Sequence, residues 1–430
     1  MKSQGDGGES MVVGLDFGAR YTKALFRSSD PNDRIPRLLR FSERASDGED
    51  LPFAAFSAIA FSNGTVTFGT EAMRKPANQR HDLLKLGIVD TERFRRRATA
   101  SGPPVEVMAA LFLAWALGRV RRSLEAEHPG ASFVVNVAAP MDHRGDVRIK
   151  QRYRRILHAA WTMAMDAEEP EIGDAVSQYT AVGRAERLLS EHPQDDGIAR
   201  WRIVPETIPP IVSILRTPGS RSQCEGIFIN VDMGAATTQV SINRLNDAYP
   251  HATPSGRVIC LADESHRLGC DEFSGSYEAE KAAKLAKLLA EVHRGSLERQ
   301  ETELGRMAWD HRRLVVFTTG GGCRRSDVRF TLQERFAQWG RSESEAGHSA
   351  DEGRALRFLN HEPVVHGLVS EKELALRSFL TVAHGLCWDR WEVWPTFVES
   401  SQADAEPTNE QAASNAAPIP PNTPWIGSHH

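Results

Sequence analysis

Apolar residues in the first half of the chain recur with the two periods of regular secondary structure. Over residues 105–125 they return every three or four positions, which predicts a helix with a wide apolar face. The unbroken apolar run at residues 131–139 predicts a buried strand, and an arginine-rich helix is expected at about residues 148–165. Strands that alternate with helices indicate an α/β protein with mixed sheets.

The same alternation continues toward the C-terminus. The pattern predicts a helix at residues 181–191 and a strand at 202–205 that runs into a proline-rich helix start. A strongly periodic helix is expected at residues 278–294. An apolar strand at residues 314–319 then leads directly into three consecutive glycines, Gly320, Gly321 and Gly322.

One short segment occurs twice. Residues 12–26 read VVGLDFGARYTKALF and residues 228–242 read FINVDMGAATTQVSI, so that a shift of 216 residues superposes Asp16 on Asp232. Each copy is an apolar run that ends in aspartate, followed by small residues and a second β-rich run, which is typical of a strand–turn–strand unit. Two equivalent hairpins half a chain apart indicate a molecule with two similar lobes.

The residue types in these turns favour phosphate binding. Glycine and alanine let backbone amides approach a ligand closely, and successive amides in a tight turn form an anion-binding concavity. A carboxylate beside such a turn would repel phosphate unless a cation lay between them. Asp16 and Asp232 therefore suggest Mg²⁺ held largely through water. Two such turns that face each other across a cleft would hold a polyphosphate from both sides.

Composition narrows the class of protein. A length of 430 residues suits two or three compact units, and 40% hydrophobic with 25% charged residues is a globular balance. The net charge of −5 provides no basic field for nucleic acid. Five cysteines without a CxxC pair, no secretory signal and no apolar stretch long enough to span a bilayer favour the cytoplasm, with no membrane as a partner.

Seven motifs together resemble one superfamily. GLDFGARYTKALF and INVDMGAATTQVSI are similar to its two phosphate loops, and VVFTTGGGCRRSDV is similar to its adenosine motif. VVNVAAPMDHRGDVR, IVPETIPPIVSIL, HRLGCDEF and FLTVAHGLC resemble its remaining conserved segments, in the family's order. The sequence thus resembles the actin, hexokinase and seventy-kilodalton heat-shock protein superfamily, and most of all the nucleotide-binding domain of the heat-shock members.

The resemblance implies a two-lobed actin-like ATPase fold, with two ribonuclease-H-like lobes built on mixed sheets. Lobe I would comprise residues 11–215 and lobe II residues 224–377, and a helix at 378–395 would return to lobe I. Only 50 residues separate Gly269 from Gly320, which implies a reduced outer subdomain in lobe II. The polar segments 1–10 and 396–430 are expected to be disordered tails.

The resemblance also implies roles for individual residues. Asp16 and Asp232 would organise Mg²⁺ through water, Glu206 would act on the attacking water, and Lys85 corresponds to a lysine needed for hydrolysis. The phosphates would be held by two sets of turn residues: Gly18, Ala19, Arg20 and Tyr21 in the first, and Gly234, Ala235, Ala236 and Thr237 in the second. Thr237 would also take part in catalysis. Adenine and ribose would pack on Gly320, Gly321, Gly322 and Arg324.

Each residue has an ordinary structural interpretation as well. Asp16 would serve only to cap a turn, Glu206 would be an acidic residue at a helix N-terminus, and Lys85 would be a surface lysine. The three glycines would form a simple loop.

Two departures from the heat-shock pattern leave the activity open. Ala19 and Arg20 replace two threonines that would contact the terminal phosphate, and Arg20 would either clamp that phosphate or be structural. Residues 392–430 are expected to contain no client-peptide domain. The leading hypothesis is an ATP-binding, slowly ATP-hydrolysing, chaperone-like switch that uses ATP/ADP and Mg²⁺. The alternatives are a non-hydrolysing nucleotide-binding scaffold or actin-like filament protein and, last, a sugar or carboxylate kinase.

Two smaller features of the sequence concern partners and metals. Trp388, Trp391 and Trp394 form one helical stripe, which would either cover lobe I or dock a partner protein in place of the missing client domain. Cys260, His266 and Cys270 lack a fourth ligand at suitable spacing, so a zinc site is not expected.

Overall fold

A computed structural model describes most of the N-terminal half of the chain and several later segments. The described residues are 9–30, 32–33, 35–41, 53–98, 100–141, 146–165, 173, 175–191, 200–221, 223–224, 227–246, 257–266, 315–322 and 357–388. The expected helix at 278–294, residues 1–8 and 396–430 of the two tails, and Arg324 lie outside them, as do all but the first eleven residues of the expected helix at 378–395. Ser10, which was expected to belong to the N-terminal tail, is instead the first residue of a strand.

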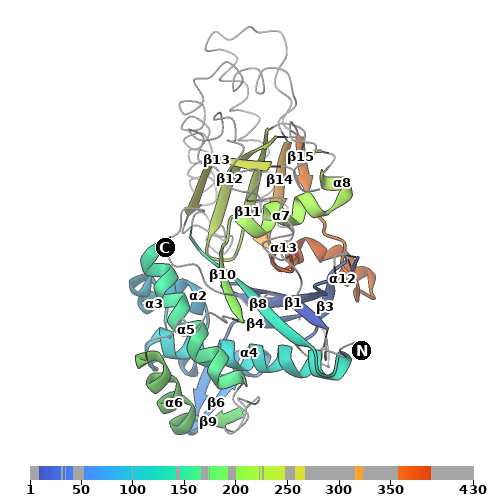
Figure 1. Cartoon of the computed structure of the whole chain (residues 1–430). Coiled ribbons are helices and arrows are strands. Elements are labelled where there is room, and N and C mark those ends of the chain that lie inside the picture. Colours follow the sequence, from blue (N-terminus) through green and yellow to red (C-terminus); the bar gives the residue numbers. More distant parts are fainter. Residues whose placement is uncertain are drawn as a thin grey trace, which may run out of the picture.

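The first large sheet is built mainly from the N-terminal part of the chain. Its strands are β1 (Ser10–Phe17), β2 (Tyr21–Ser28), β3 (Arg37–Leu39), β4 (Ala54–Phe56), β8 (Ser132–Ala139) and β10 (Trp201–Pro205). Their order is β10-β8-β1-β2-β3, and β4 also pairs with β2. Strand β2 runs antiparallel to β1 and to β3, whereas β8 runs parallel to β1 and β10 runs parallel to β8 (Figure 1).

The second large sheet repeats this arrangement. It contains β11 (Ile227–Met233), β12 (Thr238–Asn246), β13 (Arg257–His266), β14 (Val315–Thr319) and β15 (Arg357–Asn360), in the order β13-β12-β11-β14-β15. Strands β11, β12 and β13 are antiparallel neighbours, and β14 and β15 continue parallel to β11. Read from its antiparallel edge, each sheet therefore has the same order and the same strand directions.

The two hairpins also share one register. Asp16 lies opposite Lys23 in the first hairpin, and Asp232 lies opposite Gln239 in the second. Both β1 and β11 are apolar runs with side chains buried on both faces, as expected of central strands covered on each side. The sequence repeat is thus a structural repeat.

A third, smaller sheet and a layer of helices complete the part of the molecule around β1. The small sheet has the order β7-β5-β6-β9, with β5 (Ile59–Ser62), β6 (Thr65–Phe68), β7 (Arg80–His81) and β9 (Ala175–Ser177). The helices are α1 (Gly69–Met73), η1 (Ala77–Gln79), α2 (Leu84–Val89), α3 (Thr91–Arg97), α4 (Val105–Glu127), α5 (Val147–Met165) and α6 (Gln178–Ser190).

Helix α4 forms the centre of this core. Most of its side chains are buried, and Phe112 stacks on Phe17 of β1 at 5.7 Å between ring centroids. Trp115 of α4 stacks on Phe68 of β6 at 5.8 Å, so that one helix joins the first sheet to the small sheet. Aromatic pairs at this spacing add to the free energy gained by burying apolar area.

Two helices cross between the large sheets. Helix α7 (Ile208–Arg216) leads from β10, through α8 (Pro218–Arg221), to β11. Helix α13 (Thr381–Leu386), preceded by α12 (Glu371–Ala375) and η4 (Arg377–Leu380), packs on β1, where a Cβ atom at Gly14 would lie 2.2 Å from the carbonyl oxygen of Ala383. Figure 1 shows α7 and α13 together between the two sheets.

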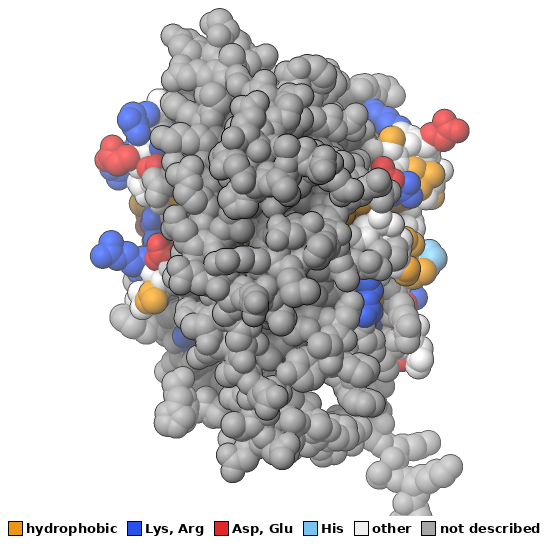
Figure 2. All heavy atoms as spheres, turned by 90° about the horizontal axis from the view of Figure 1, so that it is seen from above, with side chains coloured by type: hydrophobic (Ala, Val, Ile, Leu, Met, Phe, Trp, Pro, Cys, Tyr) orange, Lys and Arg blue, Asp and Glu red, His pale blue; other side chains and the backbone are white. Residues whose placement is uncertain are grey.

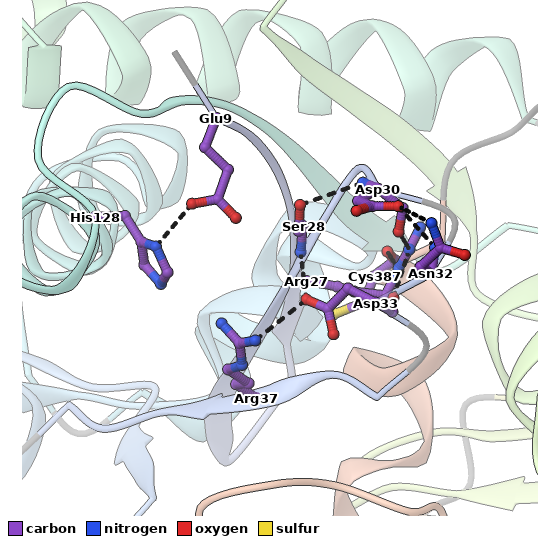
Figure 3. A network of polar contacts seen from close by, with 9 residues as sticks. All are labelled: Glu9, Arg27, Ser28, Asp30, Asn32, Asp33, Arg37, His128 and Cys387. Carbon is purple, nitrogen blue, oxygen red and sulfur yellow. Dashed lines mark hydrogen bonds and ion pairs between the residues drawn. The ribbon is translucent and has the colours of Figure 1, made fainter. Parts of the chain in front are cut away.

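A buried arginine ties the end of α13 to the first sheet. Arg27 of β2 is fully buried, and its guanidinium donates to the carbonyl oxygens of Asp33 at 2.8 Å, Asp30 at 3.1 Å and Cys387 at 3.5 Å (Figure 3). The same group lies 4.5 Å from the ring centroid of Trp388, a cation–π contact. The C-terminal end of α13 is therefore held against β2.

The structure confirms the α/β class with mixed sheets. The helices expected at 105–125, 148–165 and 181–191 are α4, α5 and α6, and the strands expected at 131–139, 202–205 and 314–319 are β8, β10 and β14. Helix α6 begins three residues earlier than expected, directly after β9. Within the described residues, no helix is long and apolar enough to cross a membrane.

Candidate functional site

The two repeated turns share one backbone hydrogen bond. The amide of Gly18 donates to the carbonyl oxygen of Tyr21 at 3.1 Å, and the amide of Gly234 donates to that of Thr237 at 2.8 Å. In the described part of the chain, the backbone amides of Ala19, Ala235 and Ala236 make no such bond. Each turn therefore presents amides that an anion could use.

The two turns also come together. Ala19 of the first turn and Ala236 of the second belong to one buried apolar cluster with Leu86 of α2, and Ala235 and Leu83 pack against that cluster. The two halves of the repeat, far apart in sequence, thus meet at one place. Helix α2 is adjacent to it and carries Lys85.

Asp16 is buried and paired. Its carboxylate lies 2.5 Å from the ammonium of Lys23, the residue opposite it in the hairpin, and both side chains are at most 10% exposed. The repeated sequence pattern identifies Asp16 but not Lys23. The register of the hairpin was the available signal, because residues on either side of a tight turn face one another.

Glu206 is held at both of its carboxylate oxygens. It follows β10 at the approach to α7, where Lys85 of α2 forms an ion pair with Oε1 and the side-chain amide of Gln239 donates to Oε2 at 2.6 Å. Lys85 is 3% exposed and Gln239 is 2% exposed, so Lys85 is not a surface lysine. Glu206 therefore receives one contact from the helical layer of the first sheet and one from the second sheet.

Asp232 completes the group of acids. The hydroxyl of Thr319, at the end of the neighbouring strand β14, donates to Asp232 Oδ1 at 2.8 Å. Burial raises the pKa of Asp232 to about 6, and the negative charges of Glu206 and Asp16 add to that rise, while Thr319 and Lys23 oppose it. The three acids share one site, because Gln239, the residue opposite Asp232, bonds Glu206, and the turns that follow Asp16 and Asp232 meet.

Gly320 lies directly against Asp232. It has a φ of +79°, and a Cβ atom there would fall 2.7 Å from Asp232 Oδ1 and 2.5 Å from the carbonyl oxygen of Met233. Only glycine fits both the backbone angle and the space. The end of β14 can therefore approach the second turn closely. Gly321 packs on the ring of Phe379, Gly322 is buried, and Arg324 lies outside the described residues.

Buried polar atoms without partners surround the acids. Among the described residues, Tyr153 Oη, Thr207 Oγ1 and Gln239 Oε1 are buried and form no hydrogen bond. Burial raises the pKa of the Tyr153 hydroxyl well above its usual range, and the charge of Glu206 adds to this effect. Sequence analysis missed Tyr153, because a tyrosine on the apolar face of α5 has the pattern of an ordinary core residue.

Three further residues of the two turns, Arg20, Tyr21 and Thr237, were predicted to hold phosphate. Arg20 is exposed and its guanidinium lies 5.8 Å from the ring centroid of Tyr21, which in turn packs on Phe56. Thr237 is partly buried at the end of the second turn.

The charge balance of the site leaves room for a cation. Three buried carboxylates face two ammonium groups, those of Lys23 and Lys85, which leaves an excess of one negative charge when all five are ionised. In the described part of the chain, no three His, Cys, Asp or Glu side chains are close enough to chelate a metal directly. Asp16 and Asp232, at the ends of the two repeated strands, are the carboxylates that could hold a cation here through water.

The tryptophan stripe does not form as one exposed surface. Trp388 is buried between the guanidiniums of Arg27 and Arg216, at 4.5 Å and 4.4 Å from its ring centroid, so it cannot contribute to docking. Trp391 and Trp394 lie outside the described residues, as does Cys270 of the zinc set that was not expected.

Exposed apolar side chains lie elsewhere. Val364, Val369 and Leu374, within or just before α12, are three of the five large apolar side chains that the described residues expose. Figure 2 shows hydrophobic side chains, with charged ones among them, on the side of the molecule that carries α12.

Comparison with known proteins gives no family for this chain. It matches no model of a known protein family, and a search of curated proteins finds no significant match. Its fold and the geometry of the site are therefore the basis for assigning a function.

Proposed function

We propose that this protein binds Mg²⁺–ATP between its two repeated hairpins and hydrolyses it slowly, as a heat-shock-type switch with a two-lobed actin-like ATPase fold. The observation that carries this proposal is the convergence of Asp16, Asp232 and Glu206, from three different strand ends, where the two repeated turns meet. The proposal accounts for the sequence repeat, because one nucleotide would be held by both copies.

The duplicated sheets support the two-lobed fold. Each has three antiparallel strands continued by two parallel strands, and each delivers an aspartate and a glycine turn from the end of its first strand. Helices α7 and α13 cross between the sheets, where a hinge between two lobes would lie. Closing the lobes on ATP and opening them after hydrolysis would change the affinity for a partner protein.

The residues of the site divide into two groups by task. The turn amides would receive phosphate oxygens, and Lys23 and Lys85 supply positive charge to a triphosphate. Bound Mg²⁺, held through water by Asp16 and Asp232, would neutralise charge that develops on the phosphates. Glu206 would orient and deprotonate the attacking water, and Lys85 would hold that carboxylate in place.

A second candidate is a nucleotide-binding scaffold or actin-like filament protein without turnover. It is favoured by Ala19, which provides no hydroxyl to the first turn and is buried with Leu86 and Ala236. Light scattering with and without ATP, followed by electron microscopy, separates the two candidates. Filaments without phosphate release would establish the second one, whereas a monodisperse protein with turnover would exclude it. A sugar or carboxylate kinase would consume ATP only when such an acceptor is added.

The decisive experiment is calorimetric titration of the full chain with Mg²⁺–ATP, together with an assay of phosphate release. We expect saturable binding by the wild type and weaker binding by Asp16→Asn, which loses a water-mediated metal contact. Glu206→Gln should bind ATP while its turnover falls on the order of 100-fold or more, the range for loss of a general base.

Glu71→Gln is the matched control for the second variant, because Glu71 is exposed on α1 and forms an ion pair with Arg74, the residue directly after that helix. It should bind and turn over ATP like the wild type. Absence of ATP binding by the folded wild-type protein would refute the proposed function.

A further inference from the structure

The contact between Gln239 and Glu206 joins the two large sheets inside the site. Gln239 lies on β12 of the second sheet, whereas Glu206 follows β10 of the first. The amide nitrogen of Gln239 donates to Glu206 Oε2 at 2.6 Å, and both side chains are buried. The bond therefore exists only while β12 and β10 keep their present separation.

The two hairpins use the same position differently. The residue opposite the aspartate is Lys23 in the first copy, and it pairs with its own Asp16 at 2.5 Å. In the second copy the residue opposite the aspartate is Gln239, which donates its hydrogen bond to Glu206. Asp232 accepts a hydrogen bond from Thr319. Equivalent positions of the repeat therefore have different tasks. Lys23 compensates the charge of Asp16 within its own hairpin, whereas Gln239 forms a hydrogen bond between the two sheets.

A neutral donor suits this position. The site already holds three buried carboxylates, and their mutual repulsion contributes to the raised pKa of Asp232. An acid in place of Gln239 would add a fourth negative charge, whereas the amide donates a hydrogen bond to Glu206 without changing the charge. Its carbonyl oxygen Oε1 is buried without a hydrogen-bond partner among the described residues, beside the same carboxylate.

Building on the proposed ATP hydrolysis, we infer that Gln239 is the positioning residue for Glu206: from the opposite sheet it fixes the carboxylate that acts on the attacking water. Lys85 fixes the other oxygen of Glu206 from the first sheet. Two donors at two oxygens define the plane of the carboxylate, which a single ion pair would not. Glu206 is consequently aligned only when the two halves of the molecule are closed, which links turnover to closure.

The test compares two substitutions of Gln239. Gln239→Met is nearly isosteric but cannot donate, and we expect it to lower kcat on the order of 10- to 100-fold, the effect of misplacing a reacting group by about 1 Å. Its Kd for Mg²⁺–ATP, measured by calorimetry, should stay within about threefold of the wild-type value, because Gln239 is not among the residues that hold phosphate.

Gln239→Glu provides a readout that a merely structural role would not affect. The introduced carboxyl is buried beside Glu206, so its pKa should be raised. While the introduced carboxyl is protonated, it can donate a hydrogen bond to Glu206 as the amide does. Once it is ionised, it repels the carboxylate of Glu206. Relative to the wild type, kcat of this variant should therefore recover toward acidic pH and decline as the pH increases.

Asn243→Asp is the matched control. Asn243 lies four residues further along β12, is equally buried and bonds Ser241 at 3.0 Å, away from the acids. This variant introduces the same kind of buried acid, and the shape of its pH–kcat profile should remain that of the wild type. Circular dichroism and the ATP Kd show whether each variant is folded.

The outcomes separate this inference from the proposed function. A wild-type kcat and pH profile in folded Gln239 variants would overturn the positioning role alone, and so would the same change of profile in Asn243→Asp. Wild-type protein that binds Mg²⁺–ATP but releases no phosphate would also overturn it and leave ATP binding intact. Failure of the wild type to bind ATP would instead remove the proposed function itself.

Discussion

At the scale of single residues, the candidate site is organised by the compensation of buried charge. Asp16 is paired with Lys23 and Glu206 with Lys85, and all four side chains are nearly inaccessible to solvent. A buried ion pair adds little net stability compared with apolar residues, but removing one partner leaves an uncompensated charge. Such pairs are therefore expected where the charges themselves are needed.

This reasoning makes a prediction for Lys85→Met. The variant leaves Glu206 buried with only Gln239 as a partner, and we expect the free energy of unfolding to fall by about 3–5 kcal/mol. In Lys85→Met/Glu206→Gln the unpaired charge is gone, so part of that loss should return. Urea denaturation measures all three proteins. Arg74→Met, which breaks the exposed pair with Glu71, should cost less than about 1 kcal/mol.

If the double variant were no more stable than Lys85→Met, burial of an unpaired carboxylate would not be the cause of the loss. The destabilisation would then result from packing of the lysine's methylene chain against its neighbours.

At the residue scale, the sequence identified the acids but not the groups that bind them. Asp16, Asp232 and Glu206 were predicted because they stand beside turn and helix-start signals that local sequence reveals. Lys23, Gln239 and Thr319 were not, because their role depends on which strand lies next to which. Hairpin register brings Lys23 to Asp16, the pairing of β14 with β11 brings Thr319 to Asp232, and the approach of the two sheets brings Gln239 to Glu206.

At the scale of elements, the close crossing of α7 and α13 positions the two large sheets. A Cβ atom on Gly385 of α13 would fall 1.8 Å from the carbonyl oxygen of Pro209 of α7, which is far inside contact distance. Helix α13 also lies so close to β1 that no side chain fits at Gly14. The two helices can approach this closely only because glycine occupies the crossing point.

Gly385→Ala is accordingly predicted to be strongly destabilising, because the added methyl group meets backbone that cannot turn aside. We expect a loss of about 2 kcal/mol or more in thermal or urea denaturation. Gly183→Ala is the matched control: Gly183 lies in helix α6, and a Cβ atom there meets nothing within 4 Å. That substitution should be neutral or stabilise by up to about 1 kcal/mol, since alanine is the better helix former.

Equal stability of the two alanine variants would show that α7 and α13 can separate without cost. The crossing would then not determine how the two sheets are spaced.

At the scale of the whole molecule, a chain of buried hydrogen bonds joins the second sheet to α13. The hydroxyl of Ser213 in α7 lies 2.8 Å from His361 Nε2, just after β15, and 2.9 Å from His384 Nδ1 in α13. Ser220 of α8 lies 2.9 Å from His361 Nδ1. Burial lowers the pKa of His361 to about 3, as does the neighbouring His384, and burial with the charges of Arg216 and Arg27 lowers that of His384 to about 3.

These histidines predict a loss of stability in acid. Between pH 6.5, which is their ordinary pKa, and about pH 3, both histidines are protonated in the unfolded chain but not in the folded chain. Because the unfolded state binds two more protons, the free energy of unfolding decreases as the pH falls. Each histidine contributes about 1.4 kcal/mol per pH unit. Asp232 has the opposite effect on the free energy of unfolding between about pH 6 and pH 3.8, because its carboxyl is protonated in the folded state and ionised in the unfolded state.

The three groups together should give a net slope of about 1.4 kcal/mol per pH unit between pH 6 and pH 4, measured by urea denaturation. In Asp232→Asn the slope should approach about 2.7 kcal/mol per pH unit, since the opposing group is gone. In His361→Gln the slope should be lower than in the wild type by about 1.4 kcal/mol per pH unit. An unchanged slope in His361→Gln would show that this histidine is protonated in the folded protein.

The sequence by itself determined several local features: the longer helices α4, α5 and α6, the buried strands β8 and β14, the positions of the repeated turns, and the acids at strand ends. These features depend on periodicity, turn chemistry and composition, which act over a few residues. That two sheets of like topology are formed, and that their turns meet, was implied by the repeat and by resemblance.

Only the tertiary structure decided how the site is assembled. It placed Lys85 in the interior, gave Glu206 a donor from each sheet, enclosed Trp388 between two arginines and set Gly385 against Pro209. The physical reason is that these contacts join residues tens to hundreds of positions apart. Their distances follow from how strands pair and helices pack, which no local pattern of side chains encodes.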